Sequence, residues 1–565
     1  MSAPRNTASP NPLSLAVIRH KLHAVAEEVV DTMIRTSFSP LMNQSYDFSA
    51  VVLDGKCRLL TQAERVPIHM GAIPFAMRAM ADAFEGDVKP GDVLMANDPY
   101  WGGSHIPDIT LAMPVWREDA IRFWVAVRAH HGDVGGMSAG GYSPGAKEIF
   151  HEGIRIPPIK LVHAGRIDEN LVRLIATNTR QPEDFTGDLM AQLSAVRVGE
   201  MRLAGLFERY TVDEVESCSE GILDAGEASM RAQLRRWKPG TYKAEAFMDD
   251  DGFGNDRIPI RATVTIGDGE AVVDLSESSD QVKSFINSPL ANSSSSVNVA
   301  FLYMSDDQAA QNDGSMRAIK VITRKGSICD PHHPAPVTGS TTLSATVIIE
   351  AVLRALAQAA PEQAMAGFAR RFRFAMAGKD RNGKPFIWHY FSNRGGAGGN
   401  AENDGWPNLG VLHNPGGSPS PSVERTELTY PMVVEEYSLR QDSGGAGRRR
   451  GGLGGVYKLR YEGSEPAVMN LAGEGVKVPP HGLAGGREAA VHDYALLREG
   501  KLLPLGTKEN GVALLPGDVV VCQSAGGGGH GDPGEREPER LASDVANGYV
   551  SAEAAQRDYG AVAAE

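Results

Sequence analysis

Two short polar segments carry the residues best suited to chemistry in this sequence. His105 and Asp108 lie in NDPYWGGSHIPDIT, and His130 opens the later segment HHGD. Neutral imidazoles and carboxylates are suitable ligands for a divalent transition metal. Adding Asp47 completes a set of nitrogen and oxygen ligands. If one position on the ion stays open for a water molecule, the ion would lower the pKa of that water towards ~7. The pattern predicts a centre that activates water at neutral pH.

The residues alone leave the details of this centre open. A single histidine is more often a hydrogen-bonded core or surface residue than a ligand, so the clustering carries the hypothesis. The strand before HHGD puts His131 on its apolar face and His130 on the other face, which does not decide between them. A ligand imidazole also needs a partner for its second ring nitrogen, and Asn97, Asp98 or Asp133 could provide it.

The elements around the two segments must hold them together. Apolar residues from 13 to 37 recur at three- and four-residue spacing, the period of an amphipathic helix, and a second helix is expected at 71–84. Asp47 begins a strand that leads to a turn at Asp54-Gly55. Strands at 92–96 and 121–129 each lead into one of the polar segments. Loops at strand ends commonly carry functional residues, so we expect both segments to leave neighbouring strands.

The length of 565 residues exceeds the roughly 250–300 residues at which one hydrophobic core stops growing. We predict an α+β, multi-domain protein with mixed and antiparallel sheets, a helical segment in its first half and a second half rich in strands and glycine loops. The expected parts are a disordered tail at 1–12, an α/β metal-site domain with a helical segment at 13–238, a β-rich domain at 239–340, a β-rich domain with glycine-rich loops at 341–538, and a helical tail at 539–565.

Further local patterns complete this prediction. Helical periods are expected across 167–237, with a break at Gln181-Pro182, at 343–359, and near the C-terminus, where Ser551 is placed as a cap. The run Ser293–Ser296 is predicted to be a polar loop. Glycine is concentrated in three segments that adjoin strand-like sequence and contain Asn, Arg or Asp, so ordered tight loops are favoured over flexible linkers: SNRGGAGGN, DSGGAGRRRGGLGG and SAGGGGHGDPGE.

Composition excludes several classes of protein. The net charge is −14 and no stripe of Lys and Arg with interleaved aromatics occurs, which argues against nucleic-acid and membrane partners. The four cysteines are scattered without a CxxC pair, which fits a reducing compartment. No secretion signal or run of about 18 apolar residues occurs, so a cytoplasmic location is expected. No GxxxxGK[ST] motif occurs and no GxGxxG stands between a strand and a helix, so no nucleotide site is predicted.

Several long segments are similar, in chain order, to the hydantoinase B/oxoprolinase family. They span nearly the whole chain: NDPYWGGSHIPDIT, RAHHGDVGG, EGIRIPPIKL, NTRQPEDFTGDLMAQ, VVEEYSLRQDSGGAGRRRGG and GGGGHGDPGERE. The resemblance implies that the metal site consists of His105 and Asp108 of SHIPD, His130 of AHHGD and Asp47 of SYDFS. It therefore favours His130 over His131 as the ligand.

The resemblance also implies that this chain is one half of an enzyme. Members of the family pair with a separate ATP-using subunit of the hydantoinase A type, so we expect a hetero-oligomer, α2β2 or higher. That agrees with the missing nucleotide motif. ATP would then be used by the partner, while this chain would bind Zn²⁺, Mn²⁺ or Fe²⁺.

The expected reaction is the hydrolysis of a C–N bond in a cyclic amide such as a hydantoin, 5-oxoproline or a lactam. The partner would phosphorylate the amide oxygen, and metal-activated water would attack that carbon, with loss of phosphate and opening of the ring. His131 or Asp133 could carry the proton, and Asp98 is placed with them among the catalytic residues.

Two other functions remain open from the sequence. Ketone carboxylases of the acetone and acetophenone type use a similar subunit, often longer, so chain length favours the hydrolase. A non-catalytic assembly subunit with structural histidines is the second alternative.

Overall fold

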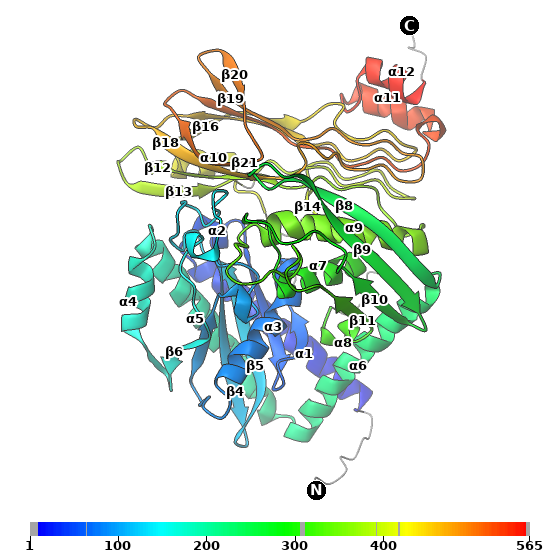
Figure 1. Ribbon diagram of the computed structural model, residues 1–565. Helices are drawn as coiled ribbons and strands as arrows, with labels where there is room; N and C mark the ends of the chain where they lie inside the picture. Colours follow the sequence, from blue (N-terminus) through cyan, green and yellow to red (C-terminus); the bar gives the residue numbers. More distant parts are fainter. Residues whose placement is uncertain (1–9, 64, 306–310, 391, 416–418, 561–565) are drawn as a thin grey trace.

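The computed structural model describes residues 10–63, 65–305, 311–390, 392–415 and 419–560. Across these ranges, helices alternate with antiparallel and mixed sheets, which confirms the predicted α+β, multi-domain class (Figure 1). Most of the tail expected at 1–12 lies outside the described residues, and Pro12 already begins the first helix. The other expected domain boundaries stay predictions.

The first sheet, in the lower half of Figure 1, carries the residues predicted to do chemistry. Its strand order is β2-β1-β5-β4-β3-β6-β7, and its neighbouring strands are antiparallel. Successive residues of a strand face opposite sides, so Val52 packs towards α1 and α5, while Val51 packs towards α3. The bounds are β1 (Phe48–Asp54), β2 (Leu59–Gln62), β3 (Val93–Ala96), β4 (Asp108–Arg117), β5 (Ala120–His130), β6 (Ile159–His163) and β7 (Arg166–Ile167).

The helices around this sheet form where the apolar period predicted them. The buried face of α1 contains Ile18, Leu22 and Val29, and the Asn11 side chain caps the helix by accepting a hydrogen bond from the Leu13 amide. The helical region that was predicted to break at Gln181-Pro182 is divided into α4, α5 and α6. The bounds are α1 (Pro12–Thr36), α2 (Pro40–Asn43), α3 (Pro67–Ala83), α4 (Glu169–Thr177), α5 (Pro182–Ala204) and α6 (Val212–Arg236).

A second sheet follows in the order β11-β10-β9-β8, with β10 and β11 parallel. It packs against α9, which also contacts α7. The segment Ser340–Ala359 is long and apolar enough to cross a membrane, but 83% of its most apolar window is buried inside the protein, as in a core helix. The bounds are β8 (Gly240–Asp250), β9 (Asp256–Gly267), β10 (Glu270–Asp274), α7 (Leu290–Tyr303), α8 (Asp313–Met316), β11 (Ile319–Ile322) and α9 (Ala345–Ala359).

The serine run belongs to buried helix α7, so the predicted polar loop was wrong. Its hydroxyls satisfy their hydrogen bonds on backbone carbonyls: Ser293 donates to Cys329 O at 2.7 Å and Ser295 donates to Ile68 O at 2.7 Å. A buried hydroxyl bonded in this way costs little, and its small size lets helices approach closely. Gly71 of α3 lies directly against Ser295.

The upper part of the molecule contains two facing sheets with an aromatic core. Their orders are β13-β12-β18-β21 and β16-β17-β22-β19-β20, and Phe374, Trp388, Tyr390 and Tyr457 are buried between them. The bounds are β12 (Phe372–Lys379), β13 (Pro385–His389), β14 (Gly410–Val411), β15 (Asn414–Pro415), α10 (Val423–Thr429), β16 (Met432–Leu439), β17 (Gly455–Tyr461), β18 (Ala467–Gly473), β19 (Asp493–Arg498), β20 (Lys501–Pro504), β21 (Lys508–Leu514) and β22 (Val519–Gln523).

The three glycine-rich segments are ordered, as predicted, but they are extended rather than tight loops. They run side by side between the upper sheets and the C-terminal helices (Figure 1). Gly452 N donates to Ala397 O at 2.8 Å, and Gly527 N donates to Gly452 O at 2.9 Å. A Cβ at Gly451 would overlap the Gly527 carbonyl oxygen, so glycine is required by this close backbone approach.

Two short helices, α11 (Pro538–Ala546) and α12 (Ala552–Tyr559), close the described chain. Ser551 caps α12 as predicted, because its hydroxyl accepts the Ala554 amide at 3.1 Å. The buried Arg536 bonds Asp544 of α11 at 2.7 Å and Asp404 at 2.9 Å, which ties these helices to the glycine-rich segments.

Because the glycine-rich segments pack so closely, a larger residue within them should destabilise the protein. We expect Gly451→Ala to lower the free energy of unfolding by about 1–3 kcal/mol, because its methyl group has no space. Gly267→Ala is the control, since nothing lies near a Cβ there, and it should change stability by less than about 0.5 kcal/mol. Denaturant unfolding of both variants measures this, and equal effects would contradict the packing argument.

Candidate metal centre

Three adjacent strands place the predicted residues at one end of the first sheet. Asp108 begins β4 and His130 ends β5, and the antiparallel register pairs these two residues directly. On the other side of β5, Phe48 of β1 pairs with Ala129, and the His130 amide donates to the Asp47 carbonyl at 3.0 Å. The register therefore brings together residues far apart in sequence.

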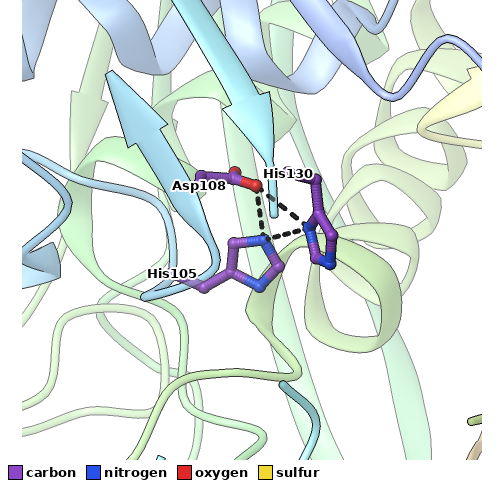
Figure 2. A group of neighbouring side chains, drawn as sticks. All are labelled: His105, Asp108 and His130. Atoms are coloured by element: carbon purple, nitrogen blue, oxygen red, sulfur yellow. Dashed lines mark hydrogen bonds and ion pairs between the residues drawn. The ribbon is translucent and has the colours of Figure 1, made fainter. Parts of the chain in front are cut away.

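His105, Asp108 and His130 converge on one point (Figure 2). His105 Nε2 lies 2.8 Å from Asp108 Oδ1, and His130 Nδ1 lies 3.2 Å from both atoms. All three side chains are buried. Two imidazole nitrogens and a carboxylate oxygen in such a triangle are a suitable donor set for a divalent metal.

The hydrogen bond made by the second ring nitrogen of His105 indicates whether this donor set fits a cation. His105 Nδ1 lies 2.8 Å from the Thr338 carbonyl oxygen, so in the neutral ring this nitrogen carries the hydrogen. The lone pair of Nε2 then faces Asp108 Oδ1, and two electron-rich atoms this close need a cation, either a proton or a metal. The arrangement fits a metal ion.

The second oxygen of Asp108 is held by other partners. Ser104 Oγ donates to Asp108 Oδ2 at 2.6 Å, and His69 Nε2 lies 3.4 Å from the same oxygen. The buried Arg128 in turn approaches Ser104 Oγ at 3.4 Å and donates to Thr110 Oγ1 at 2.9 Å. These contacts orient the carboxylate so that Oδ1 faces the two histidines.

The electrostatics keep Asp108 ionised. Burial would raise its pKa, but the nearby His105 and His69 rings, with the close contacts that His105 and His130 make to its carboxylate, hold its pKa well below the usual value. Burial would lower the pKa of His105, but attraction to Asp108, hydrogen bonds to Asp108 and the Thr338 carbonyl, and attraction to Asp47 together raise it. The pKa of His69 is lowered, mainly by burial. The centre thus presents a buried anion to its neighbours.

Asp47, His105 and His130 line a common cavity of about 40 Å³. Asp47 lies outside the tightest cluster of three ligand atoms but on the same cavity wall. The remaining wall comes from distant parts of the chain: Val66, Ile68, His69, Tyr142, Thr341, Thr342, Arg371, Arg394, Gly410, Val411, His413 and Asn414. The site is therefore shared between the first sheet and the upper half of the molecule.

The structure does not bring the proposed proton carriers into this cavity. His131 points to the other face of the sheet, where its Nε2 bonds Gln192 Oε1 at 2.9 Å and its ring packs on Phe185. Asp133 pairs with Arg180 at 3.0 Å. Both side chains have structural partners away from the cavity, so neither faces the predicted metal centre.

The other two residues considered as partners of a ligand imidazole support the loop that carries His105. Asn97 donates to Ile106 O at 2.7 Å, and its own Oδ1 accepts the Ile156 amide at 2.7 Å. Asp98 caps the following short helix and pairs with Arg155 at 2.7 Å. The partner of His105 Nδ1 is instead a backbone carbonyl, that of Thr338.

Sequence reasoning missed His69, His389, His413 and Arg371. None stands in a recognisable motif: His69 lies in a helix, His389 ends strand β13, and His413 lies in the β14–β15 turn. They reach the site only through packing of separate sheets and loops. No pattern of spacing in the chain could have identified them.

His389 lies beside His130 and lines a larger cavity of about 220 Å³. Its ring lies 6.0 Å from that of His130, and its Nε2 lies 2.8 Å from the Gly132 carbonyl oxygen. The larger cavity has an aromatic wall that includes Phe386, Trp388 and Tyr430. Polar and charged side chains, among them Asp184, Lys384 and Arg425, complete its wall, so this second cavity is of mixed character.

Comparison with known protein families identifies the class of protein that has this fold and this centre. A family model described as Hydantoinase B/oxoprolinase matches residues 11–533. The chain belongs to the hydantoinase B/oxoprolinase family, as the sequence segments predicted.

Individual relatives cover the whole chain. The beta subunit of the caprolactamase of Pseudomonas jessenii is 36% identical, with 98% of this chain and 96% of that protein covered. The B subunit of a putative D-/L-hydantoinase of a Pseudomonas species is 29% identical and covers 97% and 95%. The 5-oxoprolinase of Saccharomyces cerevisiae is 28% identical over 92% of this chain, which spans only 42% of that longer protein.

Solved structures show the same fold. The crystal structure of the ATP-dependent caprolactamase from Pseudomonas jessenii superposes with a TM-score of 0.93 at 34% identity and covers 99% of this chain and 97% of that one. Nucleotide-free acetone carboxylase gives a TM-score of 0.90 at 20% identity, with 98% and 80% covered. At that identity the second match concerns the fold alone.

The segment whose Thr338 carbonyl contacts His105 is itself held by a buried carboxyl group. We therefore expect the stability of the protein to depend on the ionisation of that group. Glu152 accepts the Val337 amide at 3.0 Å and the Thr338 amide at 2.8 Å. Burial raises its pKa from 4.5 to about 7. The folded protein therefore binds this proton more tightly than the unfolded chain, and the resulting stability is present below pH 4.5 and lost as pH rises through 7.

We expect Glu152→Gln to remove this pH dependence. We compare the free energies of unfolding of the variant and of the unsubstituted protein. Their difference should shift in favour of the variant by on the order of 2–3 kcal/mol between pH 4.5 and pH 8. Denaturant unfolding at several pH values measures the difference. Glu148→Gln, whose side chain is 47% exposed, is the control and should follow the unsubstituted protein. A parallel pH profile for Glu152→Gln would contradict the raised pKa.

Proposed function

We propose that His105, Asp108, His130 and Asp47 bind one divalent metal ion. The observation that carries this proposal is the buried convergence of two imidazole nitrogens and a carboxylate oxygen, with a second carboxylate on the same cavity wall. Mixed nitrogen and oxygen ligation suits Zn²⁺, Mn²⁺ or Fe²⁺. When bound, such an ion supplies Lewis acidity that activates water.

Metal analysis tests this centre directly. We expect the purified chain to hold about one equivalent of metal, and His105→Ala and Asp108→Asn each to weaken metal binding by about 100-fold or more, because each removes a ligand. His151→Ala is the control, since that side chain is 41% exposed and lies outside the cavity. A chain that carries no metal and binds none on titration would contradict the proposal.

We infer further that the chain is the hydrolytic subunit of an ATP-dependent cyclic amidase. Relatives over the full length are named as the beta subunit of a caprolactamase and the B subunit of a hydantoinase, and those names imply a partner chain. Resonance makes a planar amide a poor electrophile, so coupling to ATP has a chemical reason. We propose that a hydantoinase A-type partner phosphorylates the amide oxygen, in an assembly with at least two copies of each subunit.

The proposed reaction uses two water molecules. The first adds to the carbon of the phosphorylated amide, and the ring C–N bond breaks as its nitrogen takes up a proton, which leaves an acyl phosphate. The second water attacks the same carbon and releases phosphate together with the carboxylate. The chain's own residues bind and orient these groups, and Asp47 on the cavity wall is the acceptor best placed for a proton from water.

The compartment proposed is the cytoplasm, where a partner subunit would find ATP. The four cysteines are buried thiols with no disulfide between them, which suits a reducing environment.

Reconstitution with the partner tests the reaction. We expect the chain, co-purified with a hydantoinase A-type subunit, to open caprolactam, 5-oxoproline or a hydantoin only when ATP is present. His130→Asn and Asp47→Asn should lower the rate by about 100-fold or more, because metal-assisted activation of water is lost. His151→Ala should keep the full rate.

The same assay distinguishes the alternatives. Bicarbonate-dependent consumption of a ketone, with no cyclic amide opened, would transfer the chain to the carboxylases with which it shares its fold. Full activity in His105→Ala would make the centre structural and the chain an assembly subunit.

A further inference from the structure

Two arginines lie in the wall of the same cavity as the predicted metal ligands. Arg371 immediately precedes β12, and Arg394 lies in the segment after β13. Arg371 is 9% exposed. Both side chains come from the upper half of the molecule, whereas His130 ends a strand of the first sheet, and Asp47 and His105 lie in the segments that precede β1 and β4. The cavity thus has an acidic, imidazole-rich side and a basic side.

A third arginine adds to the positive charge behind this wall. Arg373 stacks on the Tyr142 ring, with its guanidinium carbon 3.6 Å from the ring centroid, and bonds His389 Nδ1 at 2.8 Å. Burial, followed by repulsion from Arg373 and Arg394, lowers the pKa of Arg371 to about 10. The guanidinium groups are therefore close enough to repel each other, and an anion placed among them would offset that repulsion.

The cavity wall also contains a neutral histidine beside these charged groups. His413 lines the cavity and is 6% exposed, and burial, with repulsion from Arg371, lowers its pKa to about 3. In the described part of the protein its Nδ1 atom has no hydrogen-bond partner. A buried polar atom without a partner is costly, so a group bound in the cavity is the natural partner for this ring.

The balance of charge on the cavity wall favours an anionic ligand. The charged side chains that line it, among the described residues, are two arginines and the carboxylate of Asp47. A bound divalent ion and the two arginines would together carry more positive charge than Asp47 and Asp108 carry negative charge, so the net charge of the site would favour a further anion. Guanidinium groups bind the oxygens of phosphate in a planar, bidentate manner that a lysine cannot reproduce.

We propose that Arg371, Arg394 and His413 form a binding site for a phosphoryl group, which is that of the activated substrate before the reaction and inorganic phosphate after it. The identity of the substrate rests on the proposed cyclic-amide function, whereas the oxyanion site rests on the cavity wall alone. The phosphoryl group would face the arginines while the reacting carbon faces Asp47 and the histidines. Stabilising the leaving phosphate in this way favours its release.

Binding of inorganic phosphate to the purified full-length chain tests this site by calorimetry, without ATP, partner or turnover. We expect Arg371→Gln and Arg394→Gln each to weaken phosphate binding by about 10-fold or more, because each removes charge-assisted hydrogen bonds. Arg371→Lys should fall between Arg371→Gln and the unsubstituted chain. Arg381→Gln is the matched control, since it removes the same charge from the exposed turn between β12 and β13.

Further measurements keep the test decisive if an arginine variant fails to fold. His413→Ala changes only the β14–β15 turn and should weaken phosphate binding by about 3-fold or more, through the loss of one hydrogen bond. Metal content and thermal unfolding are recorded for every variant. Acetate should bind more weakly than phosphate to the unsubstituted chain, because it carries fewer oxygens and less charge.

Several outcomes would overturn the site. No phosphate binding by the unsubstituted chain at up to about 10 mM would remove it. Equal affinities for Arg371→Gln and Arg381→Gln, with binding abolished by a chelator, would assign phosphate to the metal rather than to the arginines. Phosphate binding that depends on Arg371, in a chain whose complex opens no cyclic amide, would keep the site and reject only the amidase function.

Discussion

The antiparallel register between β4 and β5 is the constraint on which the centre depends. Asp108 and His130 are 22 residues apart in sequence, yet they are direct partners in the ladder, and β1 on the other side of β5 adds Asp47. Because side chains alternate between faces, a shift of one residue would send His130 to the opposite side of the sheet. That shift is unfavourable, because it would turn Val125 and Val127 away from the core that they form with α1 and α5 and bring the charged Arg128 into that core.

A second constraint comes from the cost of burying polar groups. Asp108, His105, Arg128 and Ser104 are all nearly inaccessible to solvent, and their hydrogen bonds form one connected network. Such a network leaves few rotamers open to each member, so the donor atoms point at a common position before any ligand is present. The Thr338 carbonyl determines the tautomer of His105, and it reaches the site from the segment just before the buried helix α9.

The upper half of the molecule supplies the other side of the cavity. Its sheets hold Arg371 and Arg373 at the start of β12, and the glycine-rich segments pack backbone against backbone beside them. Glycine is required there because the carbonyl of one segment occupies the space where a neighbouring Cβ would be. The same composition that suggests flexibility in an isolated segment produces close packing when several such segments lie side by side.

The sequence by itself determined the family, the α+β class and most helices, and it suggested the proposed metal ligands, because these follow from local period, residue chemistry and long characteristic segments. It left His130 and His131 equivalent until the resemblance was considered, and it suggested proton carriers at His131 and Asp133. The tertiary structure decided that both have structural partners elsewhere, Gln192 and Arg180. It alone revealed His413 and Arg371 beside the centre, because contacts between residues hundreds of positions apart depend on how the sheets pack, and no local pattern records that packing.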